Sequence, residues 1–317
     1  ITSVEVIGGN VTAGDVPDDQ ITITPNISFD SDDIHVGDNV TVIIDISMDA
    51  DPKFTVIYDN GEPINITGNK FTLENVTLGN HNVTVIYNGK STTEIFNARQ
   101  YSFSDLQDLI DEAAITGEPV VLDHDYVFQD GDEPIVVPDN VVIKGNNHTI
   151  DAQGQSNIFE VCGDNVTIQD INLDNAKDSA IRAYGHNNIN ITGVDVTNST
   201  GTAIEVIGEN TTISDVELNN VEDGIFVYGT GNADISDVSV NNANGTALDV
   251  TADDVDVNGV ELNNVTQGAI IEATTGDANV ENITVTDAAG DAVVVSAPNG
   301  TADVSDVVVD GADGTGL

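Results

Sequence analysis

The chain has 317 residues, which suggests two domains, and 39% of them are hydrophobic, which is enough to build packed cores. Its 55 Asp and Glu residues against 7 Lys and Arg give a formal net charge of −48 at pH 7. Such a surface repels nucleic acid and anionic lipid. It therefore excludes nucleic-acid binding and favours divalent cations, solubility at high salt or resistance to self-association.

Residues 1–97 are predicted to form an Ig-like β-sandwich. Residues 1–7 alternate as a strand that either extends this sandwich or is exchanged into the sheet edge of a neighbouring subunit, which would build a filament. From about residue 20 to 96, short alternating runs flank the hairpin signals Asn60-Gly61 and Asn88-Gly89. The chain begins at Ile1 rather than Met, which indicates a processed or trimmed protein.

Residues 98–140 are predicted to be a linker that contains one short helix. Ser104 and Gln107 have the spacing of a capping box, and Leu109, Ile110 and Ala113 follow on one face. Because the first coil of a stacked β-structure has an unpaired edge, we expect this helix to cover it.

Residues 141–317 repeat an I-x-x-V-x-L pattern and are predicted to form a right-handed parallel β-helix. Successive repeats are 22–24 residues apart, and each carries a further apolar pair such as Ile181 and Ala183. An earlier, degenerate coil covers about residues 141–164, and the last coil is interpreted as truncated at its C-terminal end. The repeats begin at Ile168, Ile191, Ile213, Ile235, Val257, Val280 and Val304.

One polar column recurs two residues after each central strand. Asn tolerates left-handed backbone and can bond to a like residue in the next coil, so this column is predicted to be a structural ladder. Its members are Asn175, Asn198, Asn220, Asn242, Asn264 and Asp287.

Several stretches resemble known surface proteins. Residues 78–87 resemble the closing strand of bacterial and archaeal Ig-like repeats, and the asparagine column is similar to that of pectate-lyase-type β-helices. Residues 101–110, 125–126, 142–151 and 165–173 resemble archaeal adhesin-like surface proteins, especially those of methanogens, which combine Ig-like and β-helix repeats. The resemblance covers nearly the whole chain and implies a secreted protein of the cell envelope.

The sequence offers little support for catalysis, and no catalytic residue is predicted. Asp253-Asp254 and the faintly polygalacturonase-like Tyr184-Gly185-His186 lie three coils apart, while Arg182 is expected to pair on the surface with Glu160 and Glu205. The five histidines have no metal-ligand spacing and are interpreted as solvated surface residues. No cofactor or metal site is predicted, although the Asp-rich bend at residues 130–133 could bind Ca²⁺.

Cys162, the single cysteine, is interpreted as a semi-buried filler that cannot form an internal disulfide, and no apolar run is long enough to span a membrane. The sequence contains 15 Asn-x-Ser/Thr sequons, two of which, at Asn198 and Asn264, belong to the ladder. The remaining glycosylation candidates are Asn10, Asn26, Asn39, Asn65, Asn75, Asn82, Asn147, Asn165, Asn190, Asn210, Asn244, Asn282 and Asn299.

An outward column on the third strands includes Phe226, Ile270 and Val294, which could form an interface with a partner or another subunit. These features favour a rigid, non-catalytic, extracellular scaffold or adhesin whose partners are other surface proteins, glycans or copies of itself. Two alternatives remain open. One is a filament or sheath subunit assembled through residues 1–7, and the other is a β-helix that binds or cleaves carbohydrate.

Overall fold

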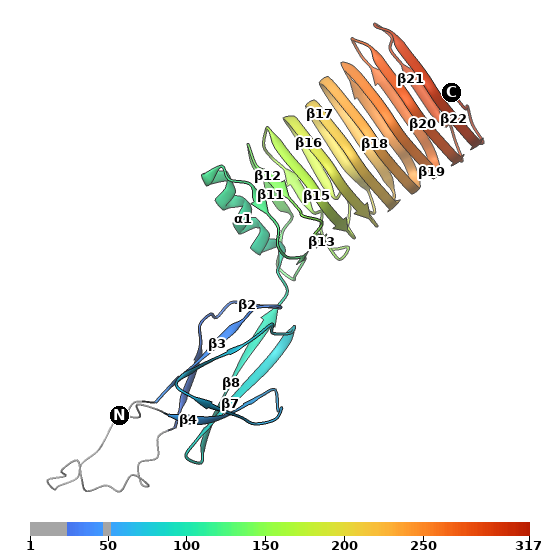
Figure 1. Cartoon of the computed structure of the whole chain (residues 1–317). Helices are drawn as coiled ribbons and strands as arrows, with labels where there is room; N and C mark the ends of the chain where they lie inside the picture. Colours follow the sequence, from blue (N-terminus) through green and yellow to red (C-terminus); the bar gives the residue numbers. More distant parts are fainter. Residues whose placement is uncertain (1–23, 47–51) are drawn as a thin grey trace, which may run out of the picture. The chain divides into compact units, whose positions relative to one another are not determined.

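The structure is a computed structural model that describes residues 24–46 and 52–317 (Figure 1). The chain divides into two compact units, residues 1–100 and residues 101–317. The predicted strand at residues 1–7 and the sequon at Asn10 lie outside the described residues.

The N-terminal unit contains two β-sheets that enclose one core. A three-stranded antiparallel sheet has the order β1-β3-β6, and a five-stranded sheet has the order β2-β8-β7-β4-β5. Side chains such as Val42, Ile44, Phe54 and Val85 alternate inward and are fully or almost fully buried. The strands are β1 (Asn26–Phe29), β2 (Ile34–His35), β3 (Val40–Asp45), β4 (Lys53–Tyr58), β5 (Ile64–Thr67), β6 (Lys70–Leu73), β7 (Gly79–Tyr87) and β8 (Lys90–Arg99).

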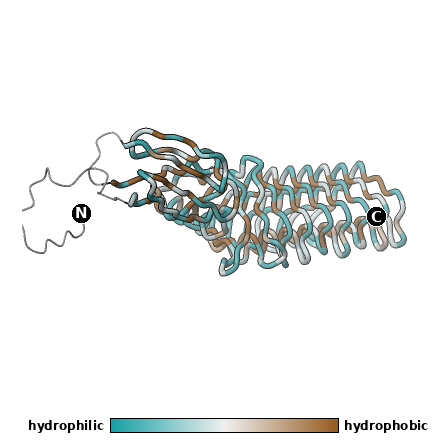
Figure 2. Tube along the Cα trace, turned by 90° about the horizontal axis from the view of Figure 1, so that it is seen from below, coloured by the Kyte–Doolittle hydropathy of each residue, from teal (hydrophilic) through white to brown (hydrophobic). Residues whose placement is uncertain are grey.

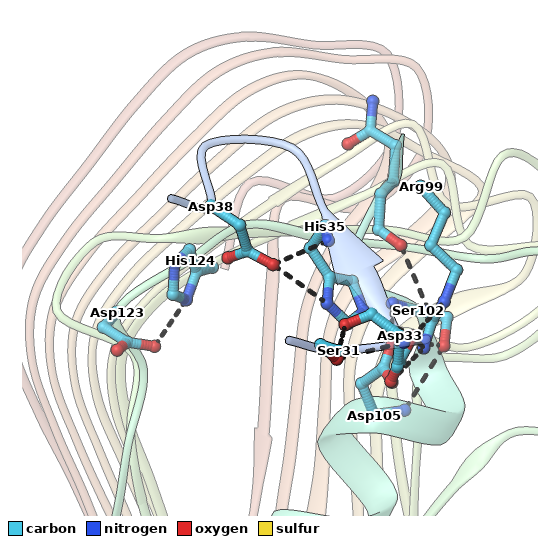
Figure 3. Close-up of polar contacts among 10 residues, drawn as sticks. Ser31, Asp33, His35, Asp38, Arg99, Ser102, Asp105, Asp123 and His124 are labelled. Atoms are coloured by element: carbon cyan, nitrogen blue, oxygen red, sulfur yellow. Dashed lines mark hydrogen bonds and ion pairs between the residues drawn. The ribbon is translucent and has the colours of Figure 1, made fainter. Parts of the chain in front are cut away.

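The hairpin predictions of this unit are confirmed. Asn60 and Asn88 have φ values of 58° and 46°, and the strands on either side of each turn pair antiparallel. The short strand β2 pairs parallel with β8, where Arg99 holds the carboxylate of Asp33 with N–O distances of 3.0 and 3.2 Å (Figure 3). Two sheets over one core make a β-sandwich, and its relation to Ig-like domains stays a prediction.

The C-terminal unit begins with the helix α1 (Phe103–Thr116). Its N-cap is Ser102, which exchanges hydrogen bonds with Asp105 in a capping box (Figure 3). The predicted box at Ser104 and Gln107 was therefore wrong by two residues, because Ser102-x-x-Asp105 offers the same spacing. The helix ends at Gly117, whose φ of 74° is favourable for glycine.

Helix α1 covers the first coil, as expected. Phe103, Leu106 and Ile110 are fully buried in the solenoid core. The Gln107 side chain bonds to the backbone of Val136 as a neighbouring strand would. Its Oε1 accepts the Val136 N–H at 2.7 Å, and its Nε2 donates to the Val136 carbonyl at 3.0 Å. The helix thus satisfies part of the sheet edge that it covers.

The rest of this unit is a parallel β-solenoid of about eight turns, with coils stacked along one axis (Figure 1). It begins a coil earlier than the predicted boundary at residue 141, because Val120 pairs with Ile143 and Tyr126 with Ile150. Its strands are β9 (Val120–Val121), β10 (Tyr126–Val127), β11 (Ile135–Val137), β12 (Val142–Lys144), β13 (Thr149–Asp151), β14 (Phe159–Val161), β15 (Val166–Asp174), β16 (Ile181–Thr197), β17 (Thr202–Val221), β18 (Asp223–Ala252), β19 (Asp254–Ala273), β20 (Ala278–Ala288), β21 (Val293–Ser296) and β22 (Ala302–Ala312).

The register follows the predicted repeat. Ile168 pairs with Ile191, which pairs with Ile213, and the column continues through Ile235 to Val257 and beyond. Figure 2 shows the hydrophobic positions recurring from coil to coil. These side chains are buried in one continuous core, apart from the last coil, where Val304, Val307 and Val309 are partly buried.

Candidate ligand-binding face

The third strand of each coil presents two outward columns of side chains. One contains Glu160, Arg182, Glu205 and Phe226, with Asp249 in the following coil. The other contains Cys162, Tyr184, Ile207 and Tyr228. We call the set Glu160, Arg182, Tyr184, Glu205, Ile207, Phe226, Tyr228 and Asp249 the tyrosine face.

Arg182 lies at the centre of a carboxylate cluster on this face. The predicted pairing holds, since its guanidinium lies 3.4 Å from an oxygen of Glu160 and 3.4 Å from an oxygen of Glu205. A third carboxylate, Asp178, contacts it from the preceding bend. Burial lowers the pKa of Arg182, but the hydrogen bond that it donates to Asp178 and the charges of Glu160 and Asp178 raise it overall.

Aromatic side chains are concentrated on the tyrosine face. Residues 141–317 contain four aromatic residues, and three of them, Tyr184, Phe226 and Tyr228, lie here. Tyr184 and Tyr228 are 47% and 55% exposed. The Arg182 guanidinium carbon lies 5.6 Å from the centre of the Tyr184 ring, within the range of a cation–π contact.

Two acidic groups near Phe226, Asp223 and Asp249, have no ion pair with a cation among the described residues. Asp249 stacks one coil beyond Phe226, and Asp223, whose Oδ1 accepts the Thr246 N–H at 2.7 Å, begins the strand that carries Phe226. Burial, followed by the charge of Asp223, raises the pKa of Asp249. The two carboxylates therefore repel each other at neutral pH.

The tyrosine face corrects the interpretation of Cys162 and contains an aromatic platform that was not predicted. Cys162 is exposed rather than semi-buried, because it occupies the outward Tyr184 column. The aromatic platform that the sequence analysis missed was detectable, since Tyr184 and Tyr228 occupy equivalent positions two repeats apart. Of the proposed interface column, Val294 is 38% exposed, while Phe226 and Ile270 are half-buried.

Of the residues considered for catalysis, Tyr184 belongs to the tyrosine face, whereas Asp253 and Asp254 lie elsewhere and accept hydrogen bonds at bends. Asp253 accepts hydrogen bonds from the hydroxyls of Thr274 and Thr275, each at 3.0 Å, and from the Gly231 amide. The bond from Gly231, followed by those from the two hydroxyls, lowers the pKa of Asp253. Asp254 accepts the Asp277 amide at 3.0 Å. Both carboxylates thus have structural partners.

The Asp-rich bend at residues 130–133 supports the capping helix. The Asp132 carboxylate accepts the amides of Phe103 at 3.2 Å, Ser104 at 3.3 Å and Gln129 at 2.8 Å, and also the Ser104 hydroxyl at 2.6 Å. Four donors bond to the two carboxylate oxygens of Asp132. The bend therefore caps the helix, a role that was not predicted when Ca²⁺ binding was considered for it.

The N-terminal sandwich contains a buried charged cluster. His81 is 5% exposed, its Nδ1 lies 2.6 Å from Asp59 Oδ2, and its Nε2 lies 2.6 Å from the Thr77 carbonyl. Asp59 and the Thr77 carbonyl are both acceptors, so the site favours the protonated form of the ring. Burial lowers its pKa, but the bond with Asp59 and the Thr77 carbonyl raise it overall. The prediction of solvated surface histidines was wrong for His81 and for His35, which is also buried.

The predicted asparagine column lies in left-handed backbone at a bend. Its residues have φ between 53° and 62°. Asn198 donates to Asn175 at 3.2 Å, Asn242 to Asn220 at 3.1 Å and Asn264 to Asn242 at 2.7 Å. The column's other predicted member is Asp287.

A second ladder was missed. Asn140, Asn165, Asn188 and Asn210 also have positive φ, and each of the last three donates its amide to the preceding one. Their spacings of 25, 23 and 22 residues match the repeat and could have revealed the ladder from the sequence.

Hydrogen bonds within the protein, including those of the two ladders, reduce the number of sequons whose Asn is available for glycosylation. N-glycosylation needs the Asn amide nitrogen, and in several candidates this atom already donates a hydrogen bond within the protein. The occupied candidates are Asn165, Asn210, Asn244, Asn282 and Asn299. Among the described residues, the candidates that are exposed and donate no such bond are Asn26, Asn39, Asn65, Asn75 and Asn147, while Asn82 and Asn190 are half-buried.

Comparison with known proteins supports the solenoid. The family model described as the right handed beta helix region matches residues 202–317. A search of curated proteins found no match, and a search of solved structures found none. Within the described residues, every helix is too short or too polar to cross a membrane.

Proposed function

Because this chain is a right-handed β-helix repeat protein, we propose that it is a secreted or cell-surface scaffold without catalytic activity. The observation that carries the proposal is the parallel strand pairing that continues from coil to coil between β9 and β22. Each coil is bonded to both neighbours over several residues, so bending or extending the stack requires many hydrogen bonds to break together. Such a stack serves to hold a surface at a distance from its attachment point.

The acidic exterior supports the same role. A net charge of −48 keeps the surface hydrated and opposes association with other acidic polymers. It also disfavours cleavage of acidic polysaccharide, because Arg182 is already surrounded by three carboxylates. Adhesive contacts would be made through the tyrosine face, where exposed aromatic rings and charges lie together.

The remaining alternatives have less support. The filament alternative depends on residues 1–7, which lie outside the described residues. The candidate acids for carbohydrate cleavage, Asp253 and Asp254, accept backbone and hydroxyl hydrogen bonds at bends. The archaeal, adhesin-like origin remains part of the proposal, as does glycosylation at the exposed loop sequons.

Two measurements test this proposal. Negative-stain images of cells labelled with antibody against the chain should place it outside the envelope, and an intracellular label would contradict the assignment. Incubation of the purified chain with neutral and acidic polysaccharides should release neither reducing ends nor unsaturated sugars. Release that is abolished by Asp253→Asn would establish catalysis instead.

A further inference from the structure

The tyrosine face already binds one cation of the chain itself, the guanidinium of Arg182. Arg182 lies against the Tyr184 ring, between Glu160 in one neighbouring coil and Glu205 in the other. Asp178, four residues earlier in the bend, completes the set. One guanidinium is therefore held by one aromatic ring and three carboxylates.

Two coils further on, a related arrangement has an aromatic side chain in the position of the cation. Phe226 occupies the Arg182 column and Tyr228 the Tyr184 column. Glu205 lies in the coil before Phe226, and Asp249 lies in the coil after it. Asp223 precedes Phe226 by three residues, much as Asp178 precedes Arg182 by four.

The electrostatics of the second arrangement differ from those of the first in one respect. Arg182 offsets part of the negative charge of the carboxylates around it, whereas Asp223 and Asp249 repel each other, which adds to the effect of burial in raising the pKa of Asp249. The Asp249 side chain accepts no hydrogen bond from any residue that the structure describes. A cation placed here would relieve this repulsion and would also meet the exposed ring of Tyr228.

We propose that Phe226, Tyr228, Asp223 and Asp249 form a docking site for an arginine side chain of a basic protein partner. The planar guanidinium can stack on an aromatic ring while its edge donates to carboxylates, which a lysine ammonium does less well. A uronate chain is disfavoured by the same carboxylates, and a neutral sugar leaves their mutual repulsion in place. A second copy of the chain is a poor partner, because it offers only 7 Lys and Arg.

This inference rests on the proposed scaffold function and names the partner of its adhesive face. The test uses the full chain and a fluorescein-labelled peptide of four Gly-Arg repeats, with binding followed by fluorescence anisotropy at low and moderate salt. We expect Tyr228→Ala and Asp249→Asn each to weaken peptide binding roughly two- to fivefold. A Gly-Lys peptide should bind more weakly than the Gly-Arg peptide.

The matched control is Asp234→Asn. Like Asp249, Asp234 has a pKa raised by burial and by a neighbouring acid, Asp256, but it lies on the first strands of the coils. The first-strand segments 189–192, 211–214, 233–236, 255–258, 278–281 and 302–305 contain no aromatic side chain. This variant should bind the peptide within about 1.5-fold of the parent chain. Unfolding curves of all variants check that the solenoid remains intact.

Two outcomes would overturn the inference. Equal losses in Asp234→Asn and Asp249→Asn, with none in Tyr228→Ala, would mean that the net charge alone attracts the peptide. Binding of cellohexaose or chitohexaose in a Tyr228-dependent manner, without peptide binding, would make the face a glycan site. Either result is distinct from failure of the scaffold proposal, which depends on where the chain is found on cells.

Discussion

Replacing Asn242 tests why the solenoid places asparagine at its bends. The residue has a φ of 62°, donates to Asn220 at 3.1 Å and accepts from Asn264 at 2.7 Å. Asn242→Ala removes both bonds and leaves a side chain that disfavours left-handed backbone. Asn242→Gly removes the same bonds but tolerates that backbone.

The neighbouring residue supplies the control. Asn241 also belongs to a ladder, since it donates to Asn219 at 3.2 Å and accepts from Asn263 at 3.0 Å, but its φ is not positive. Asn241→Ala therefore removes two similar bonds, together with a longer third one to the Ser239 hydroxyl at 3.3 Å, at no backbone cost.

The expected losses follow from these two contributions. Because the ladder is accessible to water, each bond contributes about 0.5 kcal/mol, at the low end of the usual range. The left-handed backbone costs alanine about 1–2 kcal/mol. We expect Asn242→Ala to reduce the free energy of unfolding by about 2–3 kcal/mol, and Asn241→Ala and Asn242→Gly by about 1 kcal/mol each.

Urea denaturation of the full chain, followed by circular dichroism and by hydrogen exchange of the amides in β17, β18 and β19, would measure these differences. The exchange data are needed because stacked coils can unfold locally. If Asn241→Ala were as destabilising as Asn242→Ala, the backbone would not be the reason for asparagine at this bend.

Three further predictions concern other parts of the fold. Because the pKa of His81 is raised, its ion pair stabilises the sandwich fully below pH about 6.5, and this stability is lost as the pH rises through the folded-state pKa. Because the pKa of Asp59 is lowered, its contribution is present above pH about 3.8 and is lost as the pH falls through the folded-state pKa. Thermal unfolding should thus show a maximum in the acidic range, and His81→Gln should abolish the decline on the alkaline side. Asp132→Ala, which removes the acceptor of four donors, should cost about 1–2 kcal/mol and accelerate amide exchange in α1, whereas unchanged exchange would contradict a capping role. Gly229→Ala would place a methyl carbon 1.6 Å from the Gly208 carbonyl oxygen, so we expect a loss of about 1–3 kcal/mol, and a thermal midpoint equal to that of the parent would refute the close stacking.

The repeated part of the protein could be read directly from its sequence. Once Ile168, Ile191 and Ile213 are aligned, every coil repeats the same contacts, so a local pattern determines long-range neighbours. The asparagine column at Asn175 and its equivalents followed for the same reason. The second ladder, which begins at Asn140 and Asn165, obeyed the same rule but was not predicted, and two of its members, Asn165 and Asn210, were assigned as sequons instead.

Features outside the repeat needed the tertiary structure. The start of α1 at Phe103 and the first coil at Val120 have little periodic signal, because the chain there adapts to the end of the stack. Burial of His81 depends on how two sheets close over one core, which no local pattern specifies. These contacts form only when distant segments meet.

The sequence by itself thus determined the stacked coil, its buried aliphatic columns and its acidic exterior, since a repeat in register converts spacing along the chain into neighbours in space. Only the tertiary structure decided which polar side chains already have partners. Asp132 and Asp253 are occupied as acceptors, whereas Asp249 stacks one coil beyond Phe226 without a cation. The physical reason is that hydrogen bonds and ion pairs depend on distances of a few tenths of an ångström, which composition and period do not specify.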